Sequence, residues 1–392
     1  MSTALSATVG MGNIAGVAVA IAIGGPGAVF WMWVSAVIGM STKFFTATLA
    51  VLFRGKDSEG KTQGGPMYFI VEGLGKKWKP LAIFFSICGL IAALPVFNTN
   101  QLTQAINDIV LKPAGIYSGF QSDLTIGIIL ATITAIVVLG GLSRISRTAE
   151  KLVPSMVGLY FIMVLIILGI YGEVVPHYFK LIITDAFSAS FFEGDAFLGG
   201  VVGGLILLGI KRGAFSNEAG IGTAPMAHGA AKTNEPIREG LVAMLGPAID
   251  TLVVCTLTAL AILVTGVWES SDTNGVTLTA TAFQTVLPVY GKYGLMLCIA
   301  VFSISSLFSY SYYGTKCMSY LFGVKNKSIY NYFYIGSIIL GATTTLEMVI
   351  GLVDSVFAFM AIPTMTATII LAPRVVKEAR IYFKKLKKGD FN

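Results

Sequence analysis

The sequence contains few charged residues and few of the side chains that enzymes commonly use for catalysis. Only 12% of its 392 residues are Asp, Glu, Lys or Arg, whereas a soluble globular chain carries about 25%. The two histidines, His177 and His228, lie in unrelated segments, and no carboxylate stands near either at the spacing of a zinc site. We therefore expect neither a soluble globular protein nor an enzyme, and no cofactor is expected.

Cysteine is also scarce, and its positions exclude a disulfide framework. The four cysteines, Cys88, Cys255, Cys298 and Cys317, all fall in or at the end of apolar segments, where cysteine behaves as a small core residue. The net charge of +7 raises the possibility of a nucleic-acid partner. The basic residues, however, are distributed as in the flanks of membrane spans, so we expect no nucleic acid to bind.

Apolar residues make up 55% of the chain, and mean hydropathy is +0.79. A membrane-spanning helix needs about 20 mostly apolar residues. That criterion predicts an all-α protein of the lipid bilayer with ten transmembrane helices. The expected spans lie near residues 3–23, 27–53, 81–110, 124–141, 152–171, 196–228, 238–267, 290–321, 329–346 and 352–373.

The basic residues give an orientation. Of the 27 Lys and Arg residues, 21 lie in the segments after spans 2, 4, 6, 8 and 10 or near the span ends that border them, and these segments all face the same side. Because loops rich in Lys and Arg stay in the cytoplasm, we expect a multi-pass protein of the plasma membrane with a cytoplasmic C-terminus. Residues 374–392 then form a basic cytoplasmic tail.

Ten spans divide into two halves of five, and an odd number per half requires the second half to be inverted. We expect one transmembrane domain over residues 1–373, with repeat 1 at about 1–171 and repeat 2 at about 196–373. The first span of each half is interrupted by glycine and polar residues. Two broken spans in corresponding positions indicate the binding site of a transporter.

The first break runs from Gly10 to Asn13. A helix begins there, and the free amide groups at a helix N-terminus attract a carboxylate. Asn13 adds a side-chain amide. The carbonyl groups before the break, near Ser6 and Val9, suit a hard cation such as Na⁺. The alternative for the small residues is close helix packing, which we prefer for those after Asn13.

The second break contains Phe215, Ser216, Asn217 and Glu218. A glutamate inside a membrane is costly and is a functional candidate for that reason. It could instead form a structural ion pair with Lys43, Lys211 or Arg212. Phe215 either caps a small substrate or belongs to the core.

Three further segments place polar side chains inside apolar spans. Span 8 has five serines in nine positions, and Ser305 and Ser306 could complete the oxygen shell of a cation, unless they bond carbonyl groups of their own helix. Asp250, in the middle of span 7, is a functional candidate like Glu218. In span 3, Gln101 or Gln104 could reach a buried ligand.

Several motifs resemble one family. Residues 10–33, beginning Gly-Met-Gly-Asn-Ile-Ala-Gly, are similar to the signature of the alanine or glycine:cation symporter family. The same order of motifs follows in Gly65-Pro-Met-Tyr, in residues 211–225, in Ile249-Asp-Thr and in Ser311-Tyr-Tyr-Gly314. The resemblance runs from about residue 2 to 385. In that family Trp is frequent at the position of Tyr310, and Glu at that of Thr46.

The resemblance implies a LeuT-type fold and uptake of a small neutral amino acid driven by Na⁺. It implies that the backbone of Met11 and Gly12 holds the carboxylate. The side chains that it implies for the substrate pocket are those of Thr8, Asn13, Gln101, Phe215, Ser216 and Tyr310. The residues that it implies for the Na⁺ site are Ser6, Val9, Ser303, Ser305 and Ser306.

A channel and a substrate-sensing receptor are the alternatives to a symporter. A channel needs a continuous polar path, whereas the polar residues here gather near the middle of the spans. A receptor needs a signalling domain, and none is recognisable in the sequence. A membrane enzyme is the third alternative and lacks catalytic residues.

Overall fold

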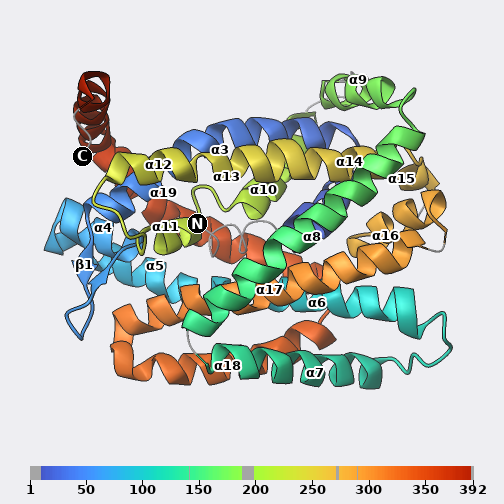
Figure 1. The fold of residues 1–392 in the computed structure, drawn as a ribbon, viewed down its shortest axis with the longest axis horizontal. Helices are drawn as coiled ribbons and strands as arrows, with labels where there is room; N and C mark the ends of the chain where they lie inside the picture. The colour runs from blue at the N-terminus through green and yellow to red at the C-terminus, as the bar shows by residue number, and fades with distance from the viewer. Residues whose placement is uncertain (1–9, 141, 188–197, 271–272, 289, 390–392) are drawn as a thin grey trace.

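The computed structural model describes residues 10–140, 142–187, 198–270, 273–288 and 290–389, and the chain is almost entirely helical within them. Figure 1 shows the long helices running side by side along the long axis of the molecule. The first half contains η1 (Gly12–Gly16), α2 (Val17–Gly24), α3 (Gly27–Leu52), β1 (Gly55–Lys56), β2 (Thr62–Gln63), α4 (Pro66–Leu74), η2 (Lys76–Trp78), α5 (Lys79–Ala92), α6 (Val96–Ile106), η3 (Asn107–Leu111), α7 (Phe120–Val138), α8 (Leu142–Ile170) and α9 (Val175–Ala186). The second half contains α10 (Leu198–Asn217), α11 (Thr223–His228), α12 (Pro236–Ala243), α13 (Leu245–Pro247), η5 (Ala248–Cys255), α14 (Thr256–Leu263), α15 (Val267–Ser270), α16 (Val276–Val286), α17 (Tyr290–Phe322), η6 (Val324–Asn326), α18 (Lys327–Thr343) and α19 (Leu346–Lys388).

Helices far apart in the sequence pack together. α3 lies against α10 and α12, α7 against α18, and α17 against α8. Figure 1 places α7 and α18 along one edge of the molecule and α3 with α12 and α14 along the other. The broken helices η1–α2 and α10–α11 lie between these layers, where other helices cover them.

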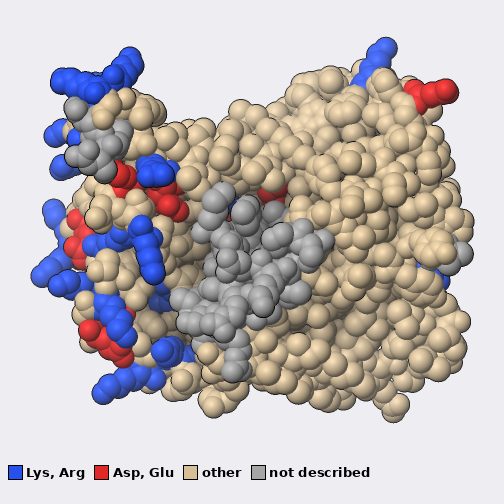
Figure 2. Space-filling model, in the orientation of Figure 1, with Lys and Arg blue, Asp and Glu red and all other residues tan. Residues whose placement is uncertain are grey.

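The apolar surface agrees with a membrane protein. Within the described residues, six helices are long and apolar enough to cross a bilayer, and a bent pair, 156–170 with 175–186, would make a seventh. Lys and Arg gather at the end that carries α4, β1 and the C-terminal end of α19, while the middle of the face shown is nearly free of charge (Figure 2). The chain is therefore a multi-pass membrane protein.

The first broken span is described from Gly10 onward. After Met11 the chain forms a π-helical turn, η1, and continues into α2. The half-helix expected before the break, with Ser6, Thr8 and Val9, lies outside the described residues. What the structure describes is therefore the helix N-terminus on which the expected carboxylate site depends.

The break in the second span is confirmed. α10 ends at Asn217, α11 begins at Thr223, and the five residues between them are not helical. Glu218 has a φ of 56°, a left-handed conformation that is uncommon outside glycine. Side chains form hydrogen bonds with part of the backbone of the break. The Asn217 side chain accepts from the amide of Ala219 at 2.9 Å. The Thr364 hydroxyl donates to the carbonyl of Ile221 at 3.1 Å.

Two of the expected spans show further detail. Residues 76–111 form one candidate membrane span, in agreement with span 3, but α5 ends at Ala92 and α6 begins at Val96. Pro95 explains this interruption, because proline has no amide donor for a continuous helix. At the end of span 10, α19 continues past residue 373 to Lys388, so part of the basic segment is helical.

A sequence match to a phosphate-binding loop is not supported by the structure. Residues 55–62 read Gly-Lys-Asp-Ser-Glu-Gly-Lys-Thr, which has the spacing of such a loop. That motif requires a strand before it and a helix that begins at its end. Here the segment forms the antiparallel β1–β2 hairpin, and the next helix begins only at Pro66. The hairpin is not a nucleotide site.

Candidate functional site

The start of the first helix, at the position of the expected first break, meets the second break inside the protein. A Cβ atom added to Gly12 would lie 3.2 Å from the Cα of Ser216 and 3.4 Å from the ring of Phe215. Glycine at position 12 therefore allows the backbone of the first broken helix to approach the end of α10. The amides of Met11 and Gly12 begin a helix whose N-terminus has no side-chain cap, and first-turn amides have no acceptor within their own helix.

A buried polar network joins the two breaks to the helix that contains Asp250. The Asn13 amide donates to one carboxylate oxygen of Asp250 at 2.7 Å, and the Ser216 hydroxyl donates to the other at 2.6 Å. All three side chains are at most 2% exposed. A buried carboxylate with donors on both oxygens is the usual way to keep such a charge inside a protein. The carboxylate of Asp250 therefore fixes Asn13 and Ser216 relative to each other.

The network continues along η5. Thr251 donates to the same oxygen of Asp250 as Ser216, at 3.1 Å, and accepts from the Asn217 amide at 3.1 Å. Asp250 and Asn13 each lie in a π-helical turn, η5 and η1. π-Helical turns are rare and occur frequently at functional sites. The turn places Asp250 and Thr251 so that both reach the end of α10.

Glu218 is a hydrogen-bonded carboxylate rather than a partner in a close ion pair. One of its oxygens accepts from the Tyr310 hydroxyl at 2.7 Å and the other from Thr223 at 2.8 Å. Within the described residues, none of Lys43, Lys211 and Arg212 lies within 4 Å of it. The ion pair considered for Glu218 is thus absent from the described part of the chain, and the carboxylate instead connects the second break to α17.

Lys43 is 3% exposed on α3, and its ammonium group would lie 3.1 Å from a Cβ added to Gly246. The carboxylates of Glu218 and Asp250 are near enough to attract it. Lys43, Glu218 and Asp250 therefore form one electrostatic group around the second break.

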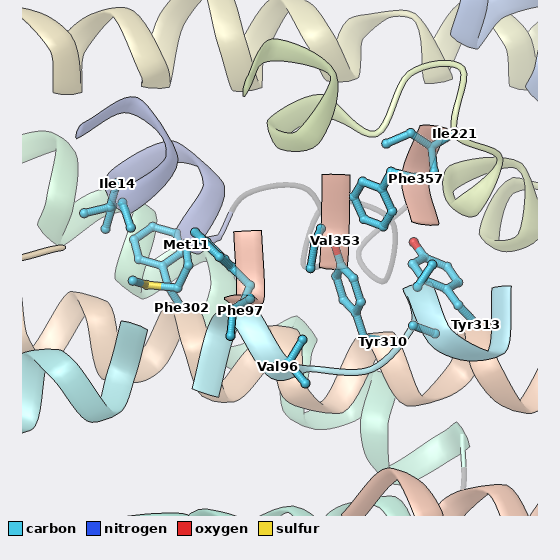
Figure 3. Close-up of a cluster of buried hydrophobic side chains, with 14 of the residues drawn as sticks. Met11, Ile14, Val96, Phe97, Ile221, Phe302, Tyr310, Tyr313, Val353 and Phe357 are labelled. Atoms are coloured by element: carbon cyan, nitrogen blue, oxygen red, sulfur yellow. The ribbon is translucent and has the colours of Figure 1, made fainter. Parts of the chain in front are cut away.

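An aromatic and apolar wall closes the other side of the breaks. The ring centroid of Phe215 lies 4.8 Å from that of Phe97 and 5.7 Å from that of Phe357. Figure 3 shows Met11, Phe97, Tyr310 and Phe357 in one region of the core. Phe215 therefore contacts Gly12 on one side and other aromatic side chains on the other. This position agrees both with a cap on a small substrate and with a core residue.

Gln101 and Gln104 lie on α6 and contact α16. The Gln101 side chain accepts from the amide of Val276, the first residue of α16, at 3.0 Å, and it donates to Gln104. Gln104 in turn donates to Thr277 at 3.0 Å. In this structure the side-chain amides of Gln101 and Gln104 hold α16 against α6 by hydrogen bonds. Gln104 also lines a polar cavity of about 420 Å³ with Asn107.

The serines of α17 divide into two kinds. Ser305 donates to the carbonyl of Phe302 at 2.9 Å, as expected for a serine that bonds its own helix. The hydroxyl of Ser303 is buried and has no hydrogen-bond partner among the described residues. Ser306 is 1% exposed, and Ser303 and Ser306 share a helix face. An unpartnered buried hydroxyl is costly, and that of Ser303 leaves its oxygen free of any partner among the described residues.

Two site residues, Asp354 and Phe97, escaped the sequence reasoning, and Arg212 was considered only as a partner of Glu218. Arg212 and Asp354 form an ion pair between α10 and α19, and the Arg212 guanidinium lies 5.6 Å from the ring centroid of Phe215. Phe97 packs on the same ring. A charged residue in span 10 was the available signal for Asp354, because acids are rare inside membranes.

Comparison with known proteins gives the family. The model of the sodium:alanine symporter family matches residues 1–392. The sodium/alanine symporter AgcS of Methanococcus maripaludis is 39% identical over 396 residues, which cover 100% of this chain and 84% of that protein. The probable sodium/glutamine symporter GlnT of Bacillus subtilis is 32% identical, covering 98% of this chain and 78% of that one.

A solved structure agrees with the fold. The crystal structure of MhsT in complex with L-phenylalanine superposes with a TM-score of 0.63 and covers 94% of this chain and 86% of that one, at 14% identity. At that identity the likeness establishes a LeuT-like fold alone. Together with the match over the whole chain, it identifies this protein as a transporter rather than an enzyme: a Na⁺-coupled amino-acid symporter that belongs to the sodium:alanine symporter family.

Proposed function

We propose that this symporter carries a small neutral amino acid, of the alanine or glycine type, together with Na⁺ across the plasma membrane. The main observation in support of this proposal is the contact of Gly12 with Phe215 and Ser216. This contact brings the start of η1 next to the end of α10. The names of AgcS and GlnT support sodium and an amino acid as substrates. Alanine and glycine are the first candidates, since Phe215 leaves little room beside Gly12.

The amino-acid carboxylate binds the free amides of Met11 and Gly12, where the helix dipole attracts negative charge. The ammonium group binds the carbonyl end of α10, which carries the opposite partial charge. Thr8, Gly10, Asn13, Ser216 and Tyr310 line the remaining space. The network around Asp250 supports this assignment, because it holds Asn13 and Ser216 in place before substrate arrives.

Gln101 and Gln104 act from the external side. Because they fasten α16 to α6, we propose that they line the entry path and release α16 when the path opens. Phe215 separates the bound amino acid from Arg212 and Asp354.

Na⁺ binds between the segment that contains Ser6 and Val9 and α17. Ser6 and Val9 supply backbone carbonyl oxygens, and Ser303, Ser305 and Ser306 supply hydroxyl oxygens, all of which suit a hard cation. The unpartnered hydroxyl of Ser303 supports this location. Lys43, Glu218 and Asp250 lie around the second break, and we propose that they balance the charges that enter with the substrate and the ion.

The proposed architecture is ten transmembrane helices in a 5+5 inverted repeat, with the broken helices first in each half. Helices occur at the positions of all ten expected spans, the first from Gly12 onward. The concentration of Lys and Arg at one end favours a cytoplasmic C-terminus there (Figure 2). Transport then proceeds by rocking of one helix bundle about the site between the breaks.

Uptake of radiolabelled alanine into proteoliposomes tests the function. We expect accumulation with an inward Na⁺ gradient and only equilibration without one. Unlabelled glycine, serine and glutamine, added as competitors, rank the substrates. Na⁺-independent accumulation would contradict the coupling, and alanine binding without any uptake would identify a receptor instead.

A further inference from the structure

A second cavity, separate from the polar one, opens between α3, α10 and α19. It has a volume of about 400 Å³, and most of its wall is apolar. Its lining includes Ile38, Leu207, Phe357, Ala358 and Met365. It is a crevice rather than a closed hole, because Ile38 is 60% and Leu207 52% exposed in a chain whose sides face lipid. An apolar crevice in this position is filled by a hydrocarbon chain when the protein is in a bilayer.

Two charged side chains line the crevice, Lys211 and Asp354, and Lys211 is exposed. The carboxylate of Asp354 is neutralised by its ion pair with Arg212. No carboxylate among the described residues lies within 4 Å of the Lys211 ammonium. The mostly apolar crevice therefore carries one uncompensated positive charge.

The depth of Lys211 fits a lipid headgroup. It lies six residues before the end of α10, which is about 9 Å along the helix. With the break near the bilayer midplane, the headgroup level is about 15 Å away. Lysine side chains on a helix tilt toward its N-terminus, here away from the midplane, and extend toward the headgroups.

We propose that this crevice is a binding site for one anionic phospholipid. The lipid phosphate binds the Lys211 ammonium, and one acyl chain lies along the apolar wall toward Met365. The charge at the rim selects an anionic headgroup over a zwitterionic one, since a choline headgroup carries its own cation. The apolar volume requires the chain as well as the phosphate, which excludes inorganic phosphate as the occupant.

The crevice also shares walls with the transport site. Phe215 lines it and contacts the position of Gly12, while Gly220 and Ile221 of the second break line it too. A lipid chain in the crevice thus packs directly on the segment that is not helical. We infer that the bound lipid stabilises the packing of α10 and α19 beside the break.

Native mass spectrometry of the purified full chain tests the proposal. The protein is equilibrated with equimolar phosphatidylglycerol and phosphatidylcholine, and the retained lipids are counted. We expect one phosphatidylglycerol to be retained preferentially, and Lys211→Gln to reduce that preference about fivefold, as expected for one Lys near an anionic lipid. Lys211→Arg should keep it, and Lys180→Gln, an exposed lysine on α9, is the matched control.

A second variant tests the crevice itself. Ala358→Phe fills the apolar volume from α19 and should lower retention of both lipids while Lys211 remains present. Retention of phosphatidylglycerol by Lys211→Gln at the level of the parent protein would overturn the proposal, and so would undiminished retention by Ala358→Phe. The melting temperature in detergent, measured with and without phosphatidylglycerol, shows whether each variant is folded and should rise with the lipid only where it binds.

Discussion

Arg212 on α10 and Asp354 on α19 form an ion pair directly beside the aromatic wall of the transport site. Arg212 is 2% exposed, Asp354 has a side chain that is 20% exposed, and the guanidinium lies over the ring of Phe215. The pair thus connects the broken α10 to the long α19 through one contact. Any movement that separates these two helices near Phe215 must break it.

Asp354→Asn should destabilise the protein, because it leaves Arg212 buried without a counter-charge. Breaking a buried pair from one side costs about 3–5 kcal/mol, and the partial exposure of Asp354 favours the lower end. A double-mutant cycle with Arg212→Gln measures the coupling through melting temperatures and alanine uptake. The double variant should be less destabilised than the two single effects added together. Additive effects would show that the pair contributes no specific coupling.

Asp250→Asn should reduce alanine uptake more than tenfold and lower the melting temperature. The carboxylate accepts from Asn13, Ser216 and Thr251, and an amide cannot accept from all of them. Each hydrogen bond to a charged group contributes about 1.5–3 kcal/mol.

Glu59→Gln is the control for this change. Glu59 pairs with Lys61 on the surface, where the two side chains are 42% and 72% exposed, so a small effect is expected there. Unchanged uptake in Asp250→Asn would contradict a role for this network in holding Asn13 and Ser216.

The break in the second span was predictable because its signal is local, and the first break stays a prediction. Glycine and polar residues inside an apolar span conflict with a continuous helix in lipid. The second break follows this rule, with Glu218 at a positive φ. Asp250 could be selected as a candidate residue for a similar reason, because an acid inside a membrane is rare and needs partners.

Partners from distant segments were not predictable. Nothing in the sequence links Asp250 to Asn13 and Ser216, or Arg212 to Asp354, because these contacts depend on how the helices pack. The amide of Gln101 was expected near a ligand, and its helix face alone did not indicate that α16 would cover it. The interruption at Pro95 had a local signal, but the apolar residues around it concealed the break.

Replacing both Ser303 and Ser306 by alanine should raise the Na⁺ concentration required for half-maximal uptake at least tenfold. Both hydroxyls are buried on one face of α17, and that of Ser303 has no partner among the described residues. Uptake measured against external Na⁺ gives the value directly.

The matched control for this change is Ser337→Ala on α18. Ser337 is as buried as the other two and donates to the carbonyl of Tyr334 at 2.7 Å. It should leave the Na⁺ dependence unchanged. If the double variant shows the Na⁺ dependence of the parent protein, the cation does not bind at this face.

Gly12→Ala should weaken alanine binding while Gly16→Ala does not. A Cβ at position 12 would lie 3.2 Å from the backbone of Ser216, so the two breaks would have to separate by a few tenths of an ångström. At position 16 the nearest atom is 3.7 Å away, which is an ordinary contact. Both positions lie in the same π-helical turn, so any general effect of alanine on that turn is shared. Equilibrium binding of labelled alanine is measured for both variants at a temperature well below the melting temperature of each. Equal affinity in both variants would mean that the close approach of the breaks does not form the substrate site.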